Sequence, residues 1–231
     1  MSDTHLKPDY LFEISWEVCN QIGGLHTAIK TKSVSLVKEF ENNYIVIGPD
    51  LVHDTGENPE FIPDRQLFSE WHAYAESKGL RIKIGRWKIE SSPIAILVDF
   101  SDHLIKKDEI FSKLWEEYKL DSLSGQWDYI EPVLFGYAVG QVIESFVLFN
   151  SSENDRIVAH FHEWMTSSGI LYLKKALPQV ATIFTNHATV LGRELSANNR
   201  PLYKELENFN PEVVSKEFRV VSKQSLEKIS A

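Results

Sequence analysis

Polar side chains follow an apolar run near the C-terminal end of the sequence. The apolar run at 180–184 leads into Thr185, Asn186 and His187, and Arg193 lies six residues beyond the histidine. Open α/β sheets bind ligands at the carboxyl ends of their strands, so we expect a site here, with a short loop carrying Arg193. His187 offers a donor or acceptor at neutral pH, and Arg193 offers a fixed cation suited to a phosphate or carboxylate. The alternative is a polar loop with a solvated arginine.

Two adjacent glycines, Gly23 and Gly24, separate the first apolar segment from a helical pattern. Glycine permits a tight turn and lets a ligand approach backbone N–H groups closely. The positive end of the following helix dipole would face that ligand. The pattern is neither GxGxxG nor a phosphate-binding P-loop, so a plain glycine turn between strand and helix is the alternative.

A third segment, HFHEW, combines two histidines with an acid and a tryptophan. On a strand, His160 and His162 face the same side, and Glu163 and Trp164 would then begin the next helix. We interpret the segment as a polar, aromatic carbohydrate site with His160 as a satisfied core residue. A zinc site formed by His160, His162 and the distant His187 is the alternative.

The predicted elements alternate between strands and helices. A largely parallel sheet covered on both faces, a Rossmann-like doubly wound α/β fold, follows from this order and from the near-continuous apolar strands. The three polar segments fall at strand ends and are expected to converge at one edge. We expect strands at 10–16, 44–49, 81–87, 94–100, 156–162 and 180–186, and helices at 25–40, 67–77, 106–118, 129–149, 163–176 and, stopping without a glycine cap, 220–231.

The composition is acidic, with 24 Lys and Arg against 33 Asp and Glu and a formal net charge of −9 over 231 residues. Nucleic-acid and anionic-membrane binding need a basic face, so neither partner is expected. The longest apolar stretch, 133–149, is short for a bilayer and predicts a buried helix starting near Pro132. Cys19, the single cysteine, is expected to be a buried small hydrophobe. One cysteine and no signal-peptide pattern predict a reducing, cytoplasmic location.

Four motifs, LFEISWEVCNQIGGLHTAIKTK, IGRWKIE, HFHEW and ATIFTNHATVLGRELSA, resemble in this order the animal and fungal glycogen (starch) synthases of glycosyltransferase family 3. The resemblance runs from about Leu11 to Ala197. It implies the GT-B fold, in which two Rossmann-like domains transfer glucose with retention from a nucleotide sugar, usually UDP-glucose, to an α-1,4-glucan. Residues 1–231 would be the N-terminal, acceptor-side domain. Its own C-terminal nucleotide-binding domain would be the partner, and the resemblance implies no cofactor or metal and a possible homo-oligomer.

The resemblance also assigns roles to residues of this sequence. His187 would line the donor-glucose pocket, and Arg193 would be the donor-side arginine. Glu163, Trp164 and His162 would lie near the sugars. Together His187, Arg193 and Glu163 are the predicted catalytic residues.

The glycine turn carries the remaining predicted site residues. Gly23 and Gly24 would lie beneath the nucleotide sugar. Gln21 stands where the family usually has Lys or Arg, and a neutral amide adds no charge for a phosphate. Gln21 therefore favours a second hypothesis, a glucan-binding or assembly module without turnover. A metal-dependent hydrolase that uses His160 and His162 is a third.

Overall fold

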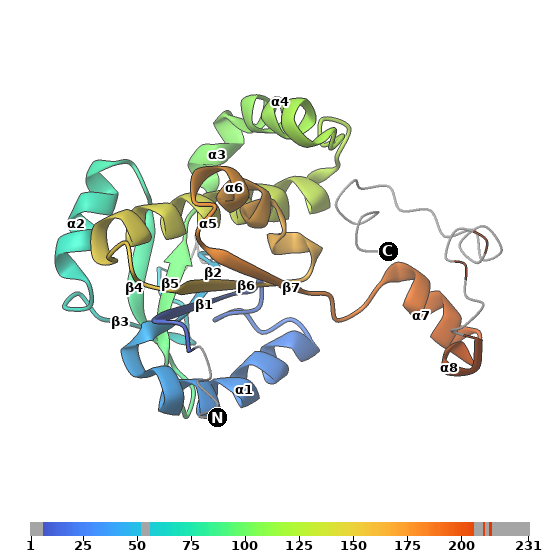
Figure 1. Ribbon diagram of the computed structural model, residues 1–231, viewed down its shortest axis with the longest axis horizontal. Coiled ribbons are helices and arrows are strands. Elements are labelled where there is room, and N and C mark those ends of the chain that lie inside the picture. The colour runs from blue at the N-terminus through green and yellow to red at the C-terminus, as the bar shows by residue number, and fades with distance from the viewer. Residues whose placement is uncertain (1–6, 52–55, 206–209, 211–212, 214–231) are drawn as a thin grey trace.

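The computed structural model describes residues 7–51, 56–205, 210 and 213, and its centre is one seven-stranded sheet with helices on both faces (Figure 1). The Rossmann-like α/β fold is confirmed. The order of the strands across the sheet is β3-β4-β5-β2-β1-β6-β7. The strands are β1 Tyr10–Ile14, β2 Tyr44–Pro49, β3 Phe61–Pro63, β4 Ile82–Trp87, β5 Ile94–Val98, β6 Ile157–His162 and β7 Ala181–Thr185.

Four of the strand pairings in the sheet are parallel and two are antiparallel. β5, β2, β1, β6 and β7 pair in parallel, whereas β4 runs antiparallel to both β5 and β3. The sequence analysis predicted a largely parallel sheet without assigning a direction to β4, and the connection at 88–93 explains why β4 is the exception. Six residues cannot hold the crossover that a parallel pair needs, but they suffice for a hairpin. The short edge strand β3, which ends in Pro63, was not predicted.

Helices cover the two faces unequally (Figure 1). α1 (Gly24–Phe40) packs on one face, and α2 (Ser69–Ser77), α5 (Trp127–Asn150) and α6 (Ser168–Ala176) cover the other. Side chains along the central strands β1, β2 and β5 alternate between two cores, as period-two geometry requires. In β2, Ile45 and Ile47 join the core under α5, while Tyr44 and Val46 join the core under α1. Cys19 is buried in the α1 core, as predicted.

The long helix α5 lies at the centre of the larger core. It begins at Trp127, before the predicted start, and Pro132 lies in its second turn. Among the described residues, α5 is the one helix long and apolar enough to cross a membrane by length and composition. Because 67% of its most apolar window is buried inside the protein, its apolar character is explained by the core. It packs closely on α6, where a side chain at Gly140 would collide with Tyr172.

The remaining described helices are short or peripheral. Two of them correct the sequence analysis. The predicted helix at 106–118 is preceded by a separate short helix, and the segment after His187 forms α7 rather than a loop. The predicted helix at 220–231 lies outside the described residues. These elements are α3 Ser101–Ile105, α4 Lys107–Tyr118, α7 Val190–Ala197, α8 Leu202–Glu205 and the 3-10 helices Glu41–Asn43 and Trp164–Thr166.

Candidate functional site

A cavity of about 400 Å³ lies at the carboxyl edge of the parallel strands. Its volume falls in the range of small-molecule sites. The three predicted segments therefore do converge, although Gln21 and His162 are not among the lining residues. The lining comprises Glu17, Gly23, Gly24 and Leu25 from the connection between β1 and α1, Glu163, Trp164 and Met165 after β6, and His187, Ala188 and Arg193 after β7.

The glycine turn is held by a carboxylate that the sequence analysis missed. Gly23 is the residue before α1, and its N–H donates to Oε2 of Glu17 at 2.9 Å. The N–H of His26 donates to the same oxygen at 2.8 Å. A negative group is favoured at a helix N-terminus, so Glu17 stabilises the start of α1 and shapes one wall of the cavity. Gln21 is exposed beside this turn. An acid six residues before a glycine pair is the sequence signal that could have indicated Glu17.

Glu163 links the ends of two neighbouring strands. Its Oε1 accepts hydrogen bonds from the backbone N–H groups of His187 at 2.6 Å and Ala188 at 3.1 Å. Its own N–H donates to the carbonyl of Thr185 at 2.9 Å. The carboxylate therefore positions the turn after β7, and Glu163 precedes the 3-10 helix Trp164–Thr166 rather than beginning the predicted helix.

The backbone of Glu163 is strained. Its φ of 65° and ψ of 162° lie in a region that is otherwise almost restricted to glycine. Such a conformation costs about 1–3 kcal/mol and persists where the surroundings determine it, commonly at functional sites. The hydrogen bonds that the carboxylate of Glu163 accepts from the turn after β7 help to hold this backbone conformation.

Trp164 lines the cavity and is half-buried. Its ring is parallel to the ring of Tyr129 in α5, with centroids 6.0 Å apart and planes at 8°. Tyr129 is fully buried, so the tryptophan packs against a residue whose position is fixed by the core. A rigid aromatic wall of this kind suits a sugar ring.

The two histidines of β6 face the same side of the sheet, as predicted, with ring centroids 4.1 Å apart. Their predicted burial is reversed. His160 is half-buried and its Nε2 bonds Oγ1 of Thr185 at 2.7 Å, whereas His162 is 2% exposed. The reason is the turn after β7, because the ring of His187 lies over His162. Burial, with the positive charge of Lys32 adding to it, lowers the pKa of His160 to about 4.

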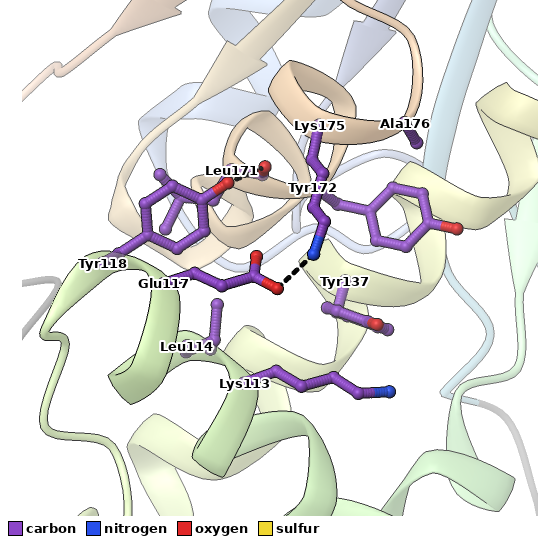
Figure 2. A pocket seen from close by; sticks show the side chains of 9 residues that line it. All are labelled: Lys113, Leu114, Glu117, Tyr118, Tyr137, Leu171, Tyr172, Lys175 and Ala176. Carbon is purple, nitrogen blue, oxygen red and sulfur yellow. Dashed lines mark hydrogen bonds and ion pairs between the residues drawn. The ribbon is translucent and has the colours of Figure 1, made fainter.

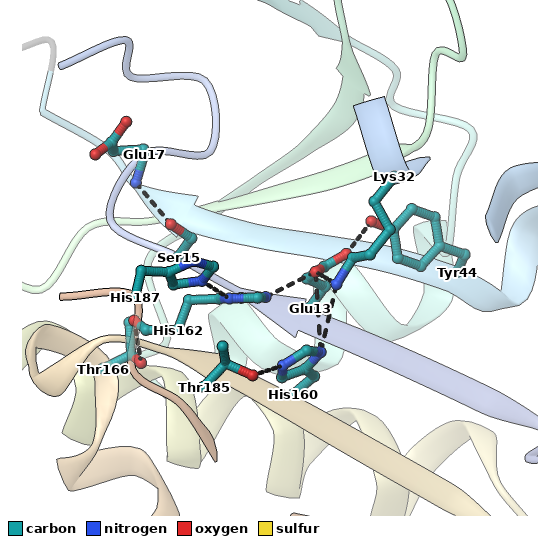
Figure 3. Close-up of polar contacts among 10 residues, drawn as sticks. All are labelled: Glu13, Ser15, Glu17, Lys32, Tyr44, His160, His162, Thr166, Thr185 and His187. Atoms are coloured by element: carbon teal, nitrogen blue, oxygen red, sulfur yellow. Dashed lines mark hydrogen bonds and ion pairs between the residues drawn. The ribbon is translucent and has the colours of Figure 1, made fainter. Parts of the chain in front are cut away.

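A buried carboxylate, Glu13 of β1, lies beside these histidines (Figure 3). His162 Nε2 bonds its Oε1 at 2.7 Å, and Lys32 and Tyr44 also donate to the carboxylate. Burial alone would raise the pKa of Glu13, but the hydrogen bond from His162 and the charge and hydrogen bond of Lys32 lower it to about 2. Glu13 was not predicted, because it lies inside the apolar run of the first strand.

The same cluster contains possible metal ligands. Atoms of Glu13, His160 and His162 lie within 4.8 Å of one another. However, the ammonium of Lys32 pairs with Glu13 and lies 3.5 Å from Nδ1 of His160. Nδ1 of His162 bonds Nε2 of His187 at 2.9 Å. The possible ligand atoms of Glu13, His160 and His162 are thus already in contact with the Lys32 ammonium or in hydrogen bonds with other side chains. The geometry therefore favours a hydrogen-bonded network over the zinc alternative.

Arg193 reaches the cavity from the first turn of α7, not from a loop. The helix starts there because Thr189 caps it. The hydroxyl oxygen of Thr189 accepts the N–H of Gly192 at 2.8 Å, and its carbonyl accepts the N–H of Arg193 at 3.0 Å. A short capped helix holds the start of the arginine side chain more firmly than a loop would.

A second cavity of about 380 Å³ lies in the helical layer between α4, α5 and α6 (Figure 2). Its charged groups are paired, Lys175 with Glu117 and Lys113 with Glu109, and Tyr118 donates to the carbonyl of Leu171 at 2.8 Å. None of the residues singled out in the sequence line it. The cavity at the sheet edge is therefore the candidate site.

The open sheet, its two helical layers and the polar cavity at the carboxyl edge define an α/β domain with one candidate small-molecule site at the sheet edge. The family model for glycogen synthase matches residues 13–231, and the chain belongs to that family. The resemblance inferred from the four motifs is thus confirmed.

Relatives of known name agree with this assignment. The chain is 32% identical over 222 residues to glycogen (starch) synthase of Dictyostelium discoideum, a match covering 96% of the chain and 25% of that protein. It is 30% identical over 221 residues to the liver glycogen (starch) synthase of Homo sapiens, covering 95% of the chain and 31% of that protein. The chain therefore spans about a quarter to a third of the length of these relatives.

Among solved structures, the catalytic domain of starch synthase IV from Arabidopsis thaliana, bound to ADP and acarbose, matches with a TM-score of 0.41 at 15% identity. That match covers 77% of this chain and 34% of the other.

Proposed function

We propose that the chain is the acceptor-side lobe of a retaining glucosyltransferase that extends an α-1,4-glucan from UDP-glucose. Family membership supports the reaction class. The observation that carries the proposal is the convergence of the glycine turn, the Glu163–Trp164 segment and the His187–Arg193 segment around one cavity. Three chain segments far apart in sequence meet there with hydrogen-bonding groups and an aromatic wall.

The charges of the cavity suit a sugar better than a diphosphate. Its lining holds two carboxylates, Glu17 and Glu163, and one guanidinium, Arg193. Both carboxylates accept backbone N–H groups, so those N–H groups are not available to a phosphate. Transfer with retention builds positive charge on the sugar and negative charge on the departing diphosphate. In this proposal the cavity of the chain binds the glucose, and the guanidinium of Arg193 provides one positive charge to stabilise the departing diphosphate.

A second lobe would supply the remaining cations and the nucleotide site. Closure of the two lobes would exclude water and favour transfer to a glucan over hydrolysis. The length of the relatives supports this division, because the chain matches only 25–31% of each. The 231-residue chain alone is therefore expected to fold and to show little or no transfer.

The test compares the 231-residue chain with a longer protein in which it continues into a second lobe. Incorporation of labelled glucose from UDP-glucose into glycogen is measured for both at equal concentration. We expect incorporation by the longer protein only. Full turnover by the 231-residue chain would contradict the two-lobe proposal.

Gln21 supports a second candidate, a glucan-binding module without turnover. Its neutral amide is exposed and does not line the cavity, so it adds no charge for a diphosphate. A full-length protein that binds maltooligosaccharide but transfers glucose from neither UDP-glucose nor ADP-glucose would establish this function instead.

A further inference from the structure

A continuous chain of hydrogen bonds joins the buried core to the cavity wall (Figure 3). It runs from Oε1 of Glu13 to Nε2 of His162 at 2.7 Å, and from Nδ1 of His162 to Nε2 of His187 at 2.9 Å. Glu13 is 1% exposed and His162 is 2% exposed, whereas His187 is exposed and lines the cavity. Three elements contribute one residue each, namely β1, β6 and the turn after β7.

The direction of each hydrogen bond follows from the charge of Glu13. The carboxylate is ionised because Lys32 pairs with it and Tyr44 donates to it. An ionised carboxylate only accepts hydrogen bonds, so Nε2 of His162 carries the proton. Lys32 already supplies the cation opposite Glu13, and a second buried cation on His162 would lack a carboxylate of its own. His162 is therefore neutral, and its Nδ1 is an acceptor.

The second bond then determines the tautomer of His187. Because Nδ1 of His162 accepts, Nε2 of His187 donates. In a neutral His187 the other nitrogen, Nδ1, carries a lone pair and no proton. Burial lowers the pKa of His187, which supports the neutral form. Its backbone N–H is held by Glu163 at 2.6 Å, so the residue is fixed at both ends.

We propose that Glu13 and His162 are positioning residues that hold His187 as a neutral imidazole with its proton on Nε2, so that Nδ1 accepts a hydrogen bond from a hydroxyl of the bound sugar. This inference rests on the proposed function and specifies how the cavity would recognise glucose. An acceptor selects a group that can donate. A hydroxyl satisfies it, and a fluorine in the same place does not.

The first experiment measures the tautomer directly. Nitrogen-15 chemical shifts of the histidine rings in the 231-residue chain distinguish protonated from unprotonated nitrogens. At pH 7 we expect His162 and His187 both to carry a proton on Nε2 alone. A proton on Nδ1 of His187, or protons on both nitrogens of His162, would overturn the proposal.

Two variants test whether the chain of bonds is responsible. Glu13→Gln removes the charge that orders it, but it also leaves Lys32 without an anionic partner, so the fold itself could fail. His162→Gln is the second variant, because its amide can still reach Glu13 while the acceptor at the Nδ1 position is lost. We expect His187 to become a mixture of tautomers in His162→Gln, whereas an unchanged single tautomer would overturn the proposal.

The second experiment is kinetic and uses the full-length protein. Donors are UDP-glucose and UDP-glucose analogues with one hydroxyl replaced by fluorine. In the wild type, one position is expected to lower kcat/KM by about tenfold, as one lost hydrogen bond would. In His162→Gln that penalty should shrink, whereas general damage to the fold would slow all donors alike. An equal penalty in both proteins would overturn the proposal.

The two readouts separate this inference from the proposed function. If no nucleotide sugar is a donor but the tautomers are as expected, the proposed function fails and the positioning of His187 stands. If UDP-glucose is a donor but His187 carries its proton on Nδ1, the proposed function stands and the positioning is overturned.

Discussion

Oε1 of Glu163 lies 2.6 Å from the backbone nitrogen of His187, so a residue at the end of β6 holds the turn at the end of β7. The same glutamate has a φ of 65°. One residue thus combines a strained backbone with the contact that positions the cavity wall. Strain of this kind is retained when the geometry it provides is needed.

Replacing Glu163 with glycine or alanine separates the effect of the strained backbone on stability from the effect of the carboxylate. Both variants lose the hydrogen bonds to His187 and Ala188, but glycine adopts the native φ and ψ freely. We expect Glu163→Gly to be more stable than Glu163→Ala by about 1 kcal/mol in urea unfolding, and both full-length variants to be poor enzymes. Equal stability of the two, or a more stable alanine variant, would show that the backbone is not strained in solution.

Removing the guanidinium of Arg193 should impair donor use without affecting the fold. A charge-assisted hydrogen bond contributes about 1.5–3 kcal/mol, so Arg193→Ala in the full-length protein should lower kcat/KM for UDP-glucose by on the order of tenfold or more. Lys174→Ala, which removes an exposed cation from α6, is the matched control and should leave the kinetics unchanged. Wild-type kinetics for Arg193→Ala would show that Arg193 takes no part in donor binding.

Gly24 should tolerate a methyl group structurally but not functionally. A Cβ at this position meets no atom within 4 Å, and the residue begins α1 and lines the cavity. Gly24→Ala should therefore keep or slightly raise the melting temperature while raising KM for UDP-glucose. Gly48→Ala is the contrasting variant, because its Cβ would collide with the carbonyl oxygen of Val18 and should destabilise the fold. If Gly24→Ala binds the donor normally, the ligand does not approach the glycine turn.

His160 should make stability depend on pH in a defined window. Its pKa is about 4 in the folded chain and about 6.5 when unfolded, so the unfolded state binds more protons between these values. The contribution of His160 to the free energy of unfolding is fully present above pH 6.5 and decreases as the pH falls to 4. The measurement is the free energy of unfolding at several pH values for wild type and His160→Gln. We expect a shallower decrease between pH 6.5 and 4 in the variant, and equal slopes would contradict the assignment.

Glu13 should affect the pH dependence of stability in a separate and lower pH range. Its pKa of about 2 lies below the ordinary glutamate value of 4.5, so between these two values the folded state binds fewer protons than the unfolded state. Its stabilisation is present above pH 4.5 and lost as the pH falls toward 2. Acid unfolding of wild type and Glu13→Gln, followed by circular dichroism, should show a weaker dependence for the variant in this range. An unchanged dependence would mean that Glu13 is not paired as described.

Local patterns predicted most of the sheet because each buried strand is an apolar run bounded by turn residues. The antiparallel direction of β4 was not predicted, although the short connection at 88–93 is visible in the sequence and indicates a hairpin. The glycine turn, Glu163 and His187 were found because polar residues at strand ends share one edge of a parallel sheet. Glu13 was not found, because its partner His162 is 149 positions away and only the folded sheet brings them together.

The most direct measurement is a crystal structure of the full-length protein with UDP-glucose bound. We predict that the glucose ring lies in the cavity between the glycine turn, Trp164 and His187, with Arg193 on the side of the diphosphate. Glucose bound elsewhere, such as the helical cavity beside Tyr137 and Tyr172, with this one empty, would contradict the account.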